Sequence, residues 1–428
     1  MKPGTLSLLL DGDRKSFARR STTISMKVGV FIDDYEPEVG GGYTIQSDIF
    51  FALIKLANEC KHNFVIFTYG KSRSNIDKLL ESSKISVIYY KPPNILERLM
   101  SEIGLHLPLI SIILKRPGKL DRLSRAAGID IMWFISPASV QVDVPYITIV
   151  WDLQHRLQPW FPEVSSNGIW QDRELYHLKS LRRATFIVAG TETGRDEIKY
   201  FYNIPSEHIR ILPHPTPTYA LNADQEVGKA VLTKYAIPEG YLFYPAQFWS
   251  HKNHANLLIS VKILKNKYGL KLPVVLVGSD KGNLNYIKQL ATELDLSTQI
   301  HFLGFVPQED LTPLYRNAFA LVYLTFFGPE NLPPLEAFAL GCPVVASNVP
   351  GASEQLGDAA LLVDPKSPEQ IALTIKTLHD SPELQNTLIK KGHEKASKWT
   401  AEDFVRGIFS ILDEYESVRR CWETISRE

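Results

Sequence analysis

The sequence feature that most constrains the fold is an alternation of short apolar runs with amphipathic stretches. This alternation is interrupted once, near the middle of the chain, and then begins again. In the first half, the spacing predicts strands at residues 27–32, 64–69, 85–90, 129–135, 146–152, 185–189 and 209–212. Helices are predicted between them at residues 43–60, 170–183 and 192–201. Alternation of this kind predicts a parallel sheet that is covered on both faces by helices.

The same pattern restarts in the second half, with strands predicted at residues 242–244, 274–277, 300–302, 321–324 and 344–346. A polar, proline-containing stretch at residues 213–240 separates the two halves and is typical of an interdomain connection. We therefore expect an α/β protein with one domain at residues 26–220 and a second at residues 221–398.

Residues 328–347 contain Leu-Pro-Pro-Leu-Glu, then a glycine and a short apolar run. Prolines are tolerated in the first turn of a helix, Gly341 suits its end, and residues 344–346 suit a buried strand. The positive end of such a helix favours phosphate. One turn inside, the carboxylate of Glu336 can accept hydrogen bonds from the vicinal hydroxyls of a ribose. The pattern indicates a nucleotide ligand; a partly exposed Glu without a binding role is the alternative.

This segment resembles the signature of the retaining family-4 glycosyltransferases, also called glycosyl transferases group 1. The resemblance extends over residues 26–415 and implies the glycosyltransferase-B fold, in which two Rossmann-like domains face each other across a cleft. It also implies that a last helix, within residues 399–428, crosses back to the first domain. The sequence of residues 245–254 resembles that of a bacterial branch involved in surface polysaccharide assembly.

In that family the signature is a Glu, seven other residues and a second Glu. The second Glu matches Glu336, whereas Gly328 occupies the first position. Glu330 lies two residues later and is a candidate substitute with a catalytic role. Asn331 and Leu332, at the start of the predicted helix, are expected to contact the donor.

Two further segments match donor-binding loops of the family. Gly41 and Gly42 follow the first strand, where glycine allows the backbone to approach phosphate or sugar closely. After residue 244, Lys252 matches the lysine that holds the donor diphosphate, with His251 beside it. Gln247 stands where the family usually has Arg. The resemblance implies that Lys252 stabilises the charge on the departing diphosphate, which would make it catalytic. A solvated loop lysine is the alternative.

The segment after the strand at residues 146–152 matches a family position where a His-Asp pair often faces the transferred sugar. Trp151 takes the place of the His, and Asp152 is retained as a candidate catalytic residue. Trp151 either stacks on the acceptor sugar or belongs to the core. His155 either contacts the acceptor or is structural.

Two turns in the second half are also similar to the family. Gly304 and Val306 lie in a loop that resembles the one holding the nucleobase through its main chain. Glu354 lies in a later turn and either supports the cleft or is an ordinary surface residue.

Composition agrees with a globular protein. The 428 residues carry zero net charge, with 44% hydrophobic and 22% charged residues, and this balance does not favour nucleic-acid binding. The three cysteines have neither metal-site spacing nor an obvious disulfide framework, which favours a reducing compartment. No apolar run reaches transmembrane length.

Two segments are expected to lie outside the common pattern. Residues 1–25 precede the first strand-like run, and we expect a disordered extension there. Residues 95–125 combine an apolar run with basic residues. They either rest on an anionic membrane surface or form an ordinary packed helix with a solvated basic end, which we favour.

The resemblance implies a retaining hexosyltransferase, which we expect to be cytoplasmic, with a peripheral contact to the membrane face as a further option. The donor would be a GDP- or UDP-sugar carrying a mannose-like or glucose-like hexose, and the acceptor a glycan or lipid-linked glycan. No metal and no further cofactor is implied. Two alternatives stay open: a sugar-nucleotide epimerase or hydrolase of the same fold, and a catalytically weak nucleotide-sugar-binding subunit of a transferase complex.

Overall fold

The structure is a computed structural model, and it describes residues 25–33, 40–69, 80, 85–91, 118–137, 142–224 and 228–422 of the chain. The expected extension at residues 1–25 therefore lies, apart from residue 25, outside the described residues. The same holds for the apolar part of the basic segment, because residues 92–117 are not described.

The first half folds around a sheet of seven strands in the order β3-β2-β1-β4-β5-β6-β7, and every pairing is parallel. Most strand residues are buried, because helices cover both faces of a parallel sheet. The strands are β1 (Lys27–Phe31), β2 (Asn63–Thr68), β3 (Ser86–Tyr89), β4 (Ile131–Phe134), β5 (Tyr146–Val150), β6 (Phe186–Ala189) and β7 (Ile209–Ile211).

The second half folds around a six-stranded parallel sheet in the order β10-β9-β8-β11-β12-β13. Its strands are β8 (Tyr241–Pro245), β9 (Val274–Val277), β10 (Ile300–Gly304), β11 (Ala318–Tyr323), β12 (Val344–Ser347) and β13 (Ala360–Val363). The two sheets share the doubly wound order of Rossmann-like domains. The prediction of an α/β protein with two Rossmann-like units is confirmed.

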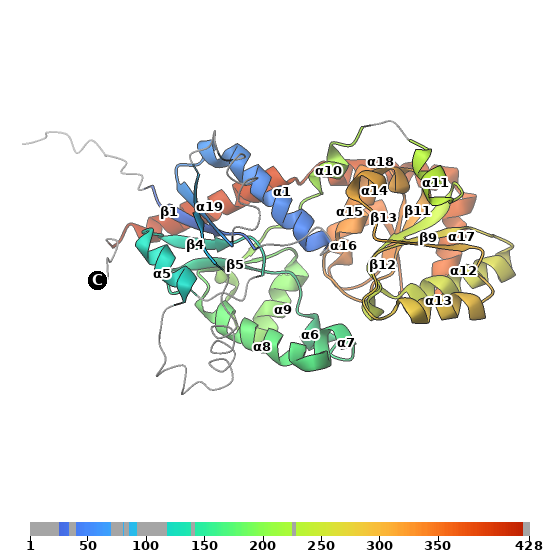
Figure 1. Cartoon of the computed structure of the whole chain (residues 1–428), viewed down its shortest axis with the longest axis horizontal. Helices are drawn as coiled ribbons and strands as arrows, with labels where there is room; N and C mark the ends of the chain where they lie inside the picture. Colours follow the sequence, from blue (N-terminus) through green and yellow to red (C-terminus); the bar gives the residue numbers. More distant parts are fainter. Residues whose placement is uncertain are drawn as a thin grey trace, which may run out of the picture.

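Figure 1 shows the two units side by side, with helices packed around each sheet. The helices of the first unit are α1 (Gly41–Leu56), α5 (Lys119–Ala126), α6 (Gln154–Leu157), α7 (Pro162–Ser165), α8 (Ile169–Ser180) and α9 (Glu192–Tyr202). Those that follow are α10 (Thr218–Leu221), α11 (Ala230–Tyr235), α12 (His254–Tyr268), α13 (Leu284–Glu293), α14 (Gln308–Arg316), α15 (Leu332–Ala339), α16 (Ala352–Leu356), α17 (Pro368–Asp380), α18 (Pro382–Ala396) and α19 (Ala401–Arg419).

The last helix, α19, returns to the first unit and packs along α1 (Figure 1). It starts with a capping box in which Thr400 and Asp403 satisfy each other's backbone amides. Ion pairs then attach it to the first unit, including Lys55–Glu402 at 2.5 Å and Arg419–Asp130 at 2.7 Å. The chain therefore crosses between the two units twice, once in each direction.

In both sheets the strand order reverses next to the first strand, because β1 lies between β2 and β4 and β8 lies between β9 and β11. Ligands of such sheets bind beyond the carboxyl ends of the strands at this reversal. The glycine loop follows β1, the loop at residues 245–254 follows β8, and residues 324–331 follow β11. The fold thus brings the predicted donor segments to the edges where ligands bind.

Two elements differ from the sequence-based expectation. The interdomain connection is not a plain loop, because α10 and α11 form within it. The strand β13 was not predicted, although its Ala-Leu-Leu-Val run between Asp358 and Asp364 is apolar and short. It pairs with β12 and forms the edge of the second sheet.

Candidate active site

The glycine loop places the start of α1 against the second unit. Gly40 precedes the helix with φ of 86°, a left-handed conformation that glycine adopts without strain. A Cβ built on Gly41 would lie 3.3 Å from Cδ1 of Leu332, at the start of α15. The predicted donor residues Gly41 and Leu332 therefore meet across the interface.

Lys252 ends the short 3₁₀ helix that follows β8 (Ser250–Lys252). Its Nζ donates a hydrogen bond to the hydroxyl of Tyr323 at 2.8 Å, and it lies 5.2 Å from the centre of that ring. Because Tyr323 is the last residue of β11, the ammonium is held at the carboxyl edge of the second sheet. Gln247 accepts a hydrogen bond from the indole of Trp249 at 3.0 Å.

His251 connects the two units. Its ring and its main-chain amide both contact Glu163 of α7, the amide at 2.8 Å, and the ring stacks on Phe327 at 3.8 Å. Burial, only partly offset by Glu163, lowers the pKa of His251 to about 4. The imidazole is therefore neutral at pH 7, and among residues 245–254 Lys252 is the one cation.

The start of α15 offers fewer free amides than its sequence suggests. Pro333 and Pro334 have no N–H, and the amide of Asn331 donates to Oε1 of Gln355 at 2.9 Å. In this first turn, the N–H of Leu332 is the one amide for which the described residues provide no hydrogen-bond acceptor. The helix end remains electropositive, but an anion there would depend largely on Lys252.

Glu336 lies one turn inside α15, as expected, and its side chain is buried. Its Oε2 accepts a hydrogen bond from the hydroxyl of Tyr315 at 2.5 Å. Burial raises the pKa of Glu336 above its usual value, although the hydrogen bond from Tyr315 acts against this rise. The ribose contact predicted for Glu336 stays a prediction, and it would have to share this carboxylate with Tyr315.

Glu330 lies between the two units. Oε1 accepts a hydrogen bond from the main-chain amide of His214 at 2.7 Å, and the carboxylate lies against Gly190 at the end of β6. Burial raises the pKa of Glu330 above its usual value, and His214 partly opposes this effect. Any side chain at position 190 would collide with this carboxylate, because a Cβ there would come within 1.3 Å of Oε2.

Glu354 contacts the first unit directly. Its carboxylate accepts hydrogen bonds from the main-chain amides of Glu192 at 2.7 Å and of Thr193 at 3.0 Å. These amides belong to the first turn of α9, whose positive end favours a negative charge. Of the two open interpretations of Glu354, support of the interface fits these contacts.

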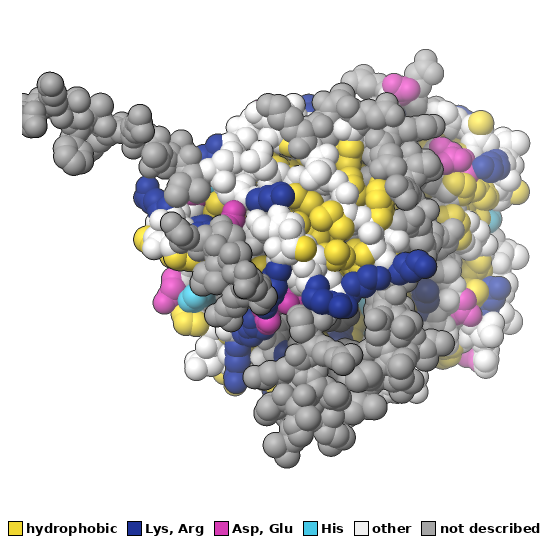
Figure 2. Space-filling model, turned by 60° about the vertical axis from the view of Figure 1, so that its left-hand side comes forward, with side chains coloured by type: hydrophobic (Ala, Val, Ile, Leu, Met, Phe, Trp, Pro, Cys, Tyr) yellow, Lys and Arg dark blue, Asp and Glu magenta, His cyan; other side chains and the backbone are white. Residues whose placement is uncertain are grey.

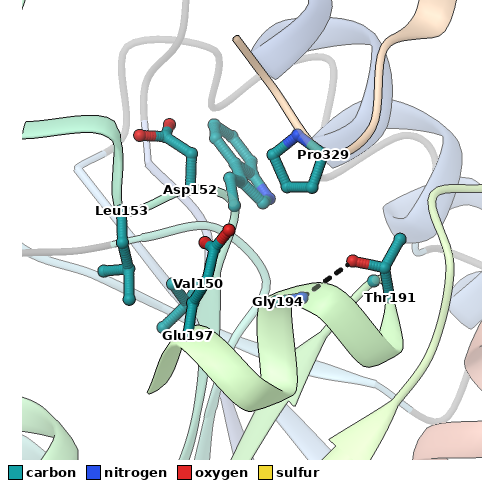
Figure 3. Close-up of a pocket in the computed structure, with 9 residues that line it drawn as sticks. Val150, Asp152, Leu153, Thr191, Gly194, Glu197 and Pro329 are labelled. Atoms are coloured by element: carbon teal, nitrogen blue, oxygen red, sulfur yellow. Dashed lines mark hydrogen bonds between the residues drawn. The ribbon is translucent and has the colours of Figure 1, made fainter. Parts of the chain in front are cut away.

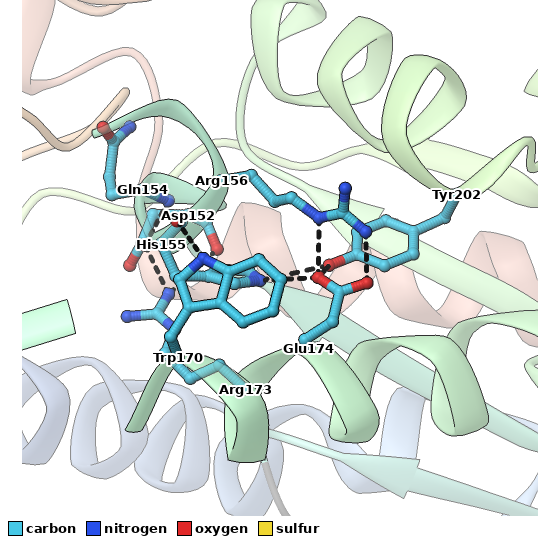
Figure 4. Close-up of polar contacts among 8 residues, drawn as sticks. All are labelled: Asp152, Gln154, His155, Arg156, Trp170, Arg173, Glu174 and Tyr202. Carbon is cyan, nitrogen blue, oxygen red and sulfur yellow. Dashed lines mark hydrogen bonds and ion pairs between the residues drawn. The ribbon is translucent and has the colours of Figure 1, made fainter. Parts of the chain in front are cut away.

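Asp152 follows β5 and is held by α8. Figure 4 shows Arg173 next to Asp152, and Oδ1 of Asp152 accepts from this guanidinium at 2.5 Å and from the amide of Gln154 at 3.0 Å. Although burial acts in the opposite direction, these two contacts lower the pKa of Asp152 below its usual value. The carboxylate is therefore charged and fixed in orientation.

His155 does not fit the predicted acceptor contact. It is 0% exposed, and its Nε2 lies 3.3 Å from Glu174 and 3.2 Å from the hydroxyl of Tyr202 (Figure 4). It also stacks on His177, with 5.4 Å between ring centres. In the short helix α6 its side chain turns inward, so of the two open interpretations the structural one fits.

A small, partly open pocket lies at the carboxyl edges of β5 and β6. Figure 3 shows Asp152 and Glu197 among its lining residues, with Pro329 of the second unit beside them. Trp151 lines the same pocket. Sequence reasoning did not identify Glu197, because its position in α9 carries no recognisable pattern; Glu163 and Tyr323 were missed for the same reason.

The loop expected to hold a base is partly exposed. Gly304 ends β10 with φ of 70°, Val306 is 3% exposed, and Phe305 between them is 52% exposed. The main chain at Gly304 is thus in a conformation that favours glycine. Whether a base binds there stays a prediction.

Figure 2 shows one face of the molecule on which Lys and Arg side chains lie beside hydrophobic ones. The described part of the basic segment is α5, where Arg125 forms ion pairs with Asp121 at 2.9 Å and Asp143 at 2.7 Å. Part of the positive charge of α5 is therefore neutralised by these ion pairs.

Within the described residues, no helix is both long and apolar enough to span a membrane. The same residues contain no group of three or more His, Cys, Asp or Glu side chains that could hold a metal ion.

Comparison with known proteins agrees with this geometry. Residues 234–395 match the family described as Glycosyl transferases group 1. The chain is 29% identical over 238 residues to O-antigen chain mannosyltransferase B of Escherichia coli, covering 54% of this chain and 62% of that protein. It is 26% identical over 204 residues to O-antigen chain mannosyltransferase RfbU of Salmonella typhimurium, covering 48% and 54%. The alignments thus span less than two thirds of either relative.

Solved structures share the whole architecture. Alr3699/HepE of Anabaena, solved in complex with UDP and glucose, superposes with a TM-score of 0.66 at 16% identity, covering 91% of this chain and all of that one (100%). WaaG, a glycosyltransferase involved in lipopolysaccharide biosynthesis, has a TM-score of 0.64 at 15% identity, covering 90% and 99%. Residues 234–395 thus match the glycosyl transferases group 1 family, and the chain has the glycosyltransferase-B fold.

Proposed function

We propose that this protein is a retaining glycosyltransferase that moves a hexose from a nucleotide diphosphate sugar to a glycan or lipid-linked glycan in polysaccharide biosynthesis. The observation that carries the proposal is the contact of Lys252 with Tyr323, which lines a pocket together with Asn331 and Pro334 at the start of α15, at the strand reversal of a family domain. The glycine loop of the first unit lies opposite, with Gly41 against Leu332. This arrangement suits a diphosphate held between the two units.

The donor would bind mainly to the second unit. Its diphosphate would lie between Lys252 and the amide of Leu332, and its ribose near Glu336. The loop with Gly304 would hold the base through its main chain. Structural neighbours solved with UDP support a uridine donor, and relatives named as mannosyltransferases support a mannose donor, so GDP- and UDP-sugars are both candidates.

In the reaction, the bond between the sugar C1 and the phosphate oxygen breaks, and the acceptor oxygen bonds to C1 on the same face. The acceptor proton passes to the departing phosphate oxygen, so retention requires no nucleophile from the protein. Lys252 stabilises the negative charge that grows on the diphosphate, and the two units hold the reactants in position. The proposal includes no metal; EDTA should leave turnover unchanged, whereas a loss restored by added Mg²⁺ would refute that part.

The relatives are named as O-antigen chain mannosyltransferases of bacteria, which supports a bacterial polysaccharide as the product. We propose in addition that the reaction takes place at the cytoplasmic side of a membrane. The protein would then be cytoplasmic, in contact with the membrane through its acceptor.

Product analysis tests the proposal. The purified full-length chain is incubated with GDP-mannose, UDP-glucose and UDP-galactose, each with a panel of mono- and oligosaccharide acceptors, and products are identified by mass spectrometry and NMR. A new glycosidic bond with the anomeric configuration of the donor is expected. Inversion would refute retention, free hexose or an epimer would favour the hydrolase or epimerase alternative, and binding without product would favour the binding subunit.

A further inference from the structure

The pocket at the ends of β5 and β6 contains a carboxyl group to which no role has been assigned. All its lining residues except Pro329 come from the first unit. Figure 3 shows Glu197 rising from α9 toward the side of the pocket where Asp152 lies. The pocket is therefore mainly a feature of the first unit, and Pro329 of the second unit borders it.

Glu197 is a half-buried carboxyl group without a partner. No hydrogen bond or ion pair joins it to another side chain of the described residues. Burial, and then the charge of Asp152, raise the pKa of Glu197 to about 7. Asp152 itself is engaged by Arg173 through Oδ1, which leaves Oδ2 without a partner among the described residues.

These groups match a neutral ligand that carries hydroxyls. Two neighbouring carboxyl groups disfavour an anion such as a diphosphate, whereas each can accept a hydrogen bond from a sugar hydroxyl. The indole Nε1 of Trp151 is also buried without an acceptor in the described part of the chain, so it can donate to a ligand oxygen. A sugar ring supplies both donors and acceptors.

We propose that Glu197 binds a hydroxyl of the acceptor sugar in this pocket, beside Asp152 and Trp151. This inference rests on the proposed function. The acceptor is favoured over the transferred sugar because the lining comes from the first unit, whereas Lys252 and α15 belong to the second. Glu330, an acidic group of the second unit that lies against Gly190 of this pocket, is already engaged by His214.

The first test measures binding without turnover. Saturation-transfer NMR is recorded with methyl α-hexopyranosides of manno, gluco and galacto configuration, in the wild type and in Glu197→Ala, Glu197→Gln and Asp196→Ala. Asp196 is the matched control, because it is the exposed acidic neighbour on the same helix. We expect Glu197→Ala to weaken glycoside binding about tenfold, the size of one hydrogen bond. Glu197→Gln should stay within about threefold of the wild type, because an amide still bonds a hydroxyl.

The second test separates the two substrates kinetically. Glu197→Ala should raise the KM for the acceptor about tenfold and leave the KM for the nucleotide sugar within about twofold. An unchanged acceptor KM, or no glycoside binding by the wild type, would overturn the inference. A raised KM for the nucleotide sugar alone would place the transferred sugar here and would also refute it. Weakened glycoside binding by a chain that forms no glycosidic bond would instead refute the proposed function while keeping the pocket as a sugar site.

Discussion

Replacing Lys252 with Ala tests the charge on which the proposed reaction depends. Lys252 is the one full positive charge in its loop, because His251 is neutral and Gln247 is uncharged. The start of α15 adds one N–H, that of Leu332, for which the described residues provide no acceptor. Loss of Lys252 should therefore resemble the loss of one preorganised donor, roughly 10²–10³ in kcat, or about 2.7–4 kcal/mol. Tyr323→Phe removes only the 2.8 Å hydrogen bond that holds the ammonium, so a loss of about 2- to 10-fold is expected.

The assay compares initial rates at saturating acceptor and measures nucleotide binding by calorimetry. Lys252→Ala should weaken binding of the nucleoside diphosphate far more than binding of the nucleoside, because only the former carries the charge. Lys281→Ala is the matched control, since this lysine lies 5.7 Å from the ring of Trp249 in the loop of Lys252 but itself follows β9 rather than β8. Equal losses for diphosphate and nucleoside, or an equal effect of Lys281→Ala, would refute the assigned role.

Three further results are expected. Glu336→Gln should weaken a ribose-containing donor by about 1–3 kcal/mol and a 2′-deoxy donor by less, and equal losses in calorimetry would leave Glu336 with only its contact to Tyr315. Glu354→Ala should lower the free energy of unfolding in urea by about 1 kcal/mol, because α9 loses its cap from the second unit; unchanged unfolding would argue against that contact. Burial lowers the pKa values of His155 and His177 to about 4 and about 3. Below pH 6.5 these histidines therefore bind protons in the unfolded chain but not in the folded chain. The free energy of unfolding should fall by up to about 2 kcal/mol per histidine at pH 5. A Tm that is flat between pH 7.5 and 5 would contradict this.

Much of the fold could be predicted from the sequence, because strands buried on both faces are apolar throughout and helices between them are amphipathic. The apolar run of β9 (Val274–Val277) was placed at its observed bounds. The strand β13 was missed because four residues at a sheet edge carry a weak signal, and α10 and α11 were missed because proline and polar residues surround them.

The candidate site likewise contains residues that the sequence predicts and partners that only the structure reveals. The residues of Leu-Pro-Pro-Leu-Glu and the position of Lys252 after β8 could be read from the sequence, since local motifs and strand ends determine them. Their partners could not. Tyr323 lies 71 residues from Lys252, and Glu163 lies 88 residues from His251, so only packing of distant segments brings them together.

The inward turn of His155 and the presence of Glu197 and Asp152 in one pocket have the same origin. A single side chain carries no information about the face on which a tertiary contact will bury it, because burial depends on neighbours from other elements. The sequence by itself determined two doubly wound sheets and the loops that reach their carboxyl edges. Only the tertiary structure decided which carboxylates remain free to meet a ligand, because charge, burial and hydrogen bonding are set by contacts between segments far apart in the chain.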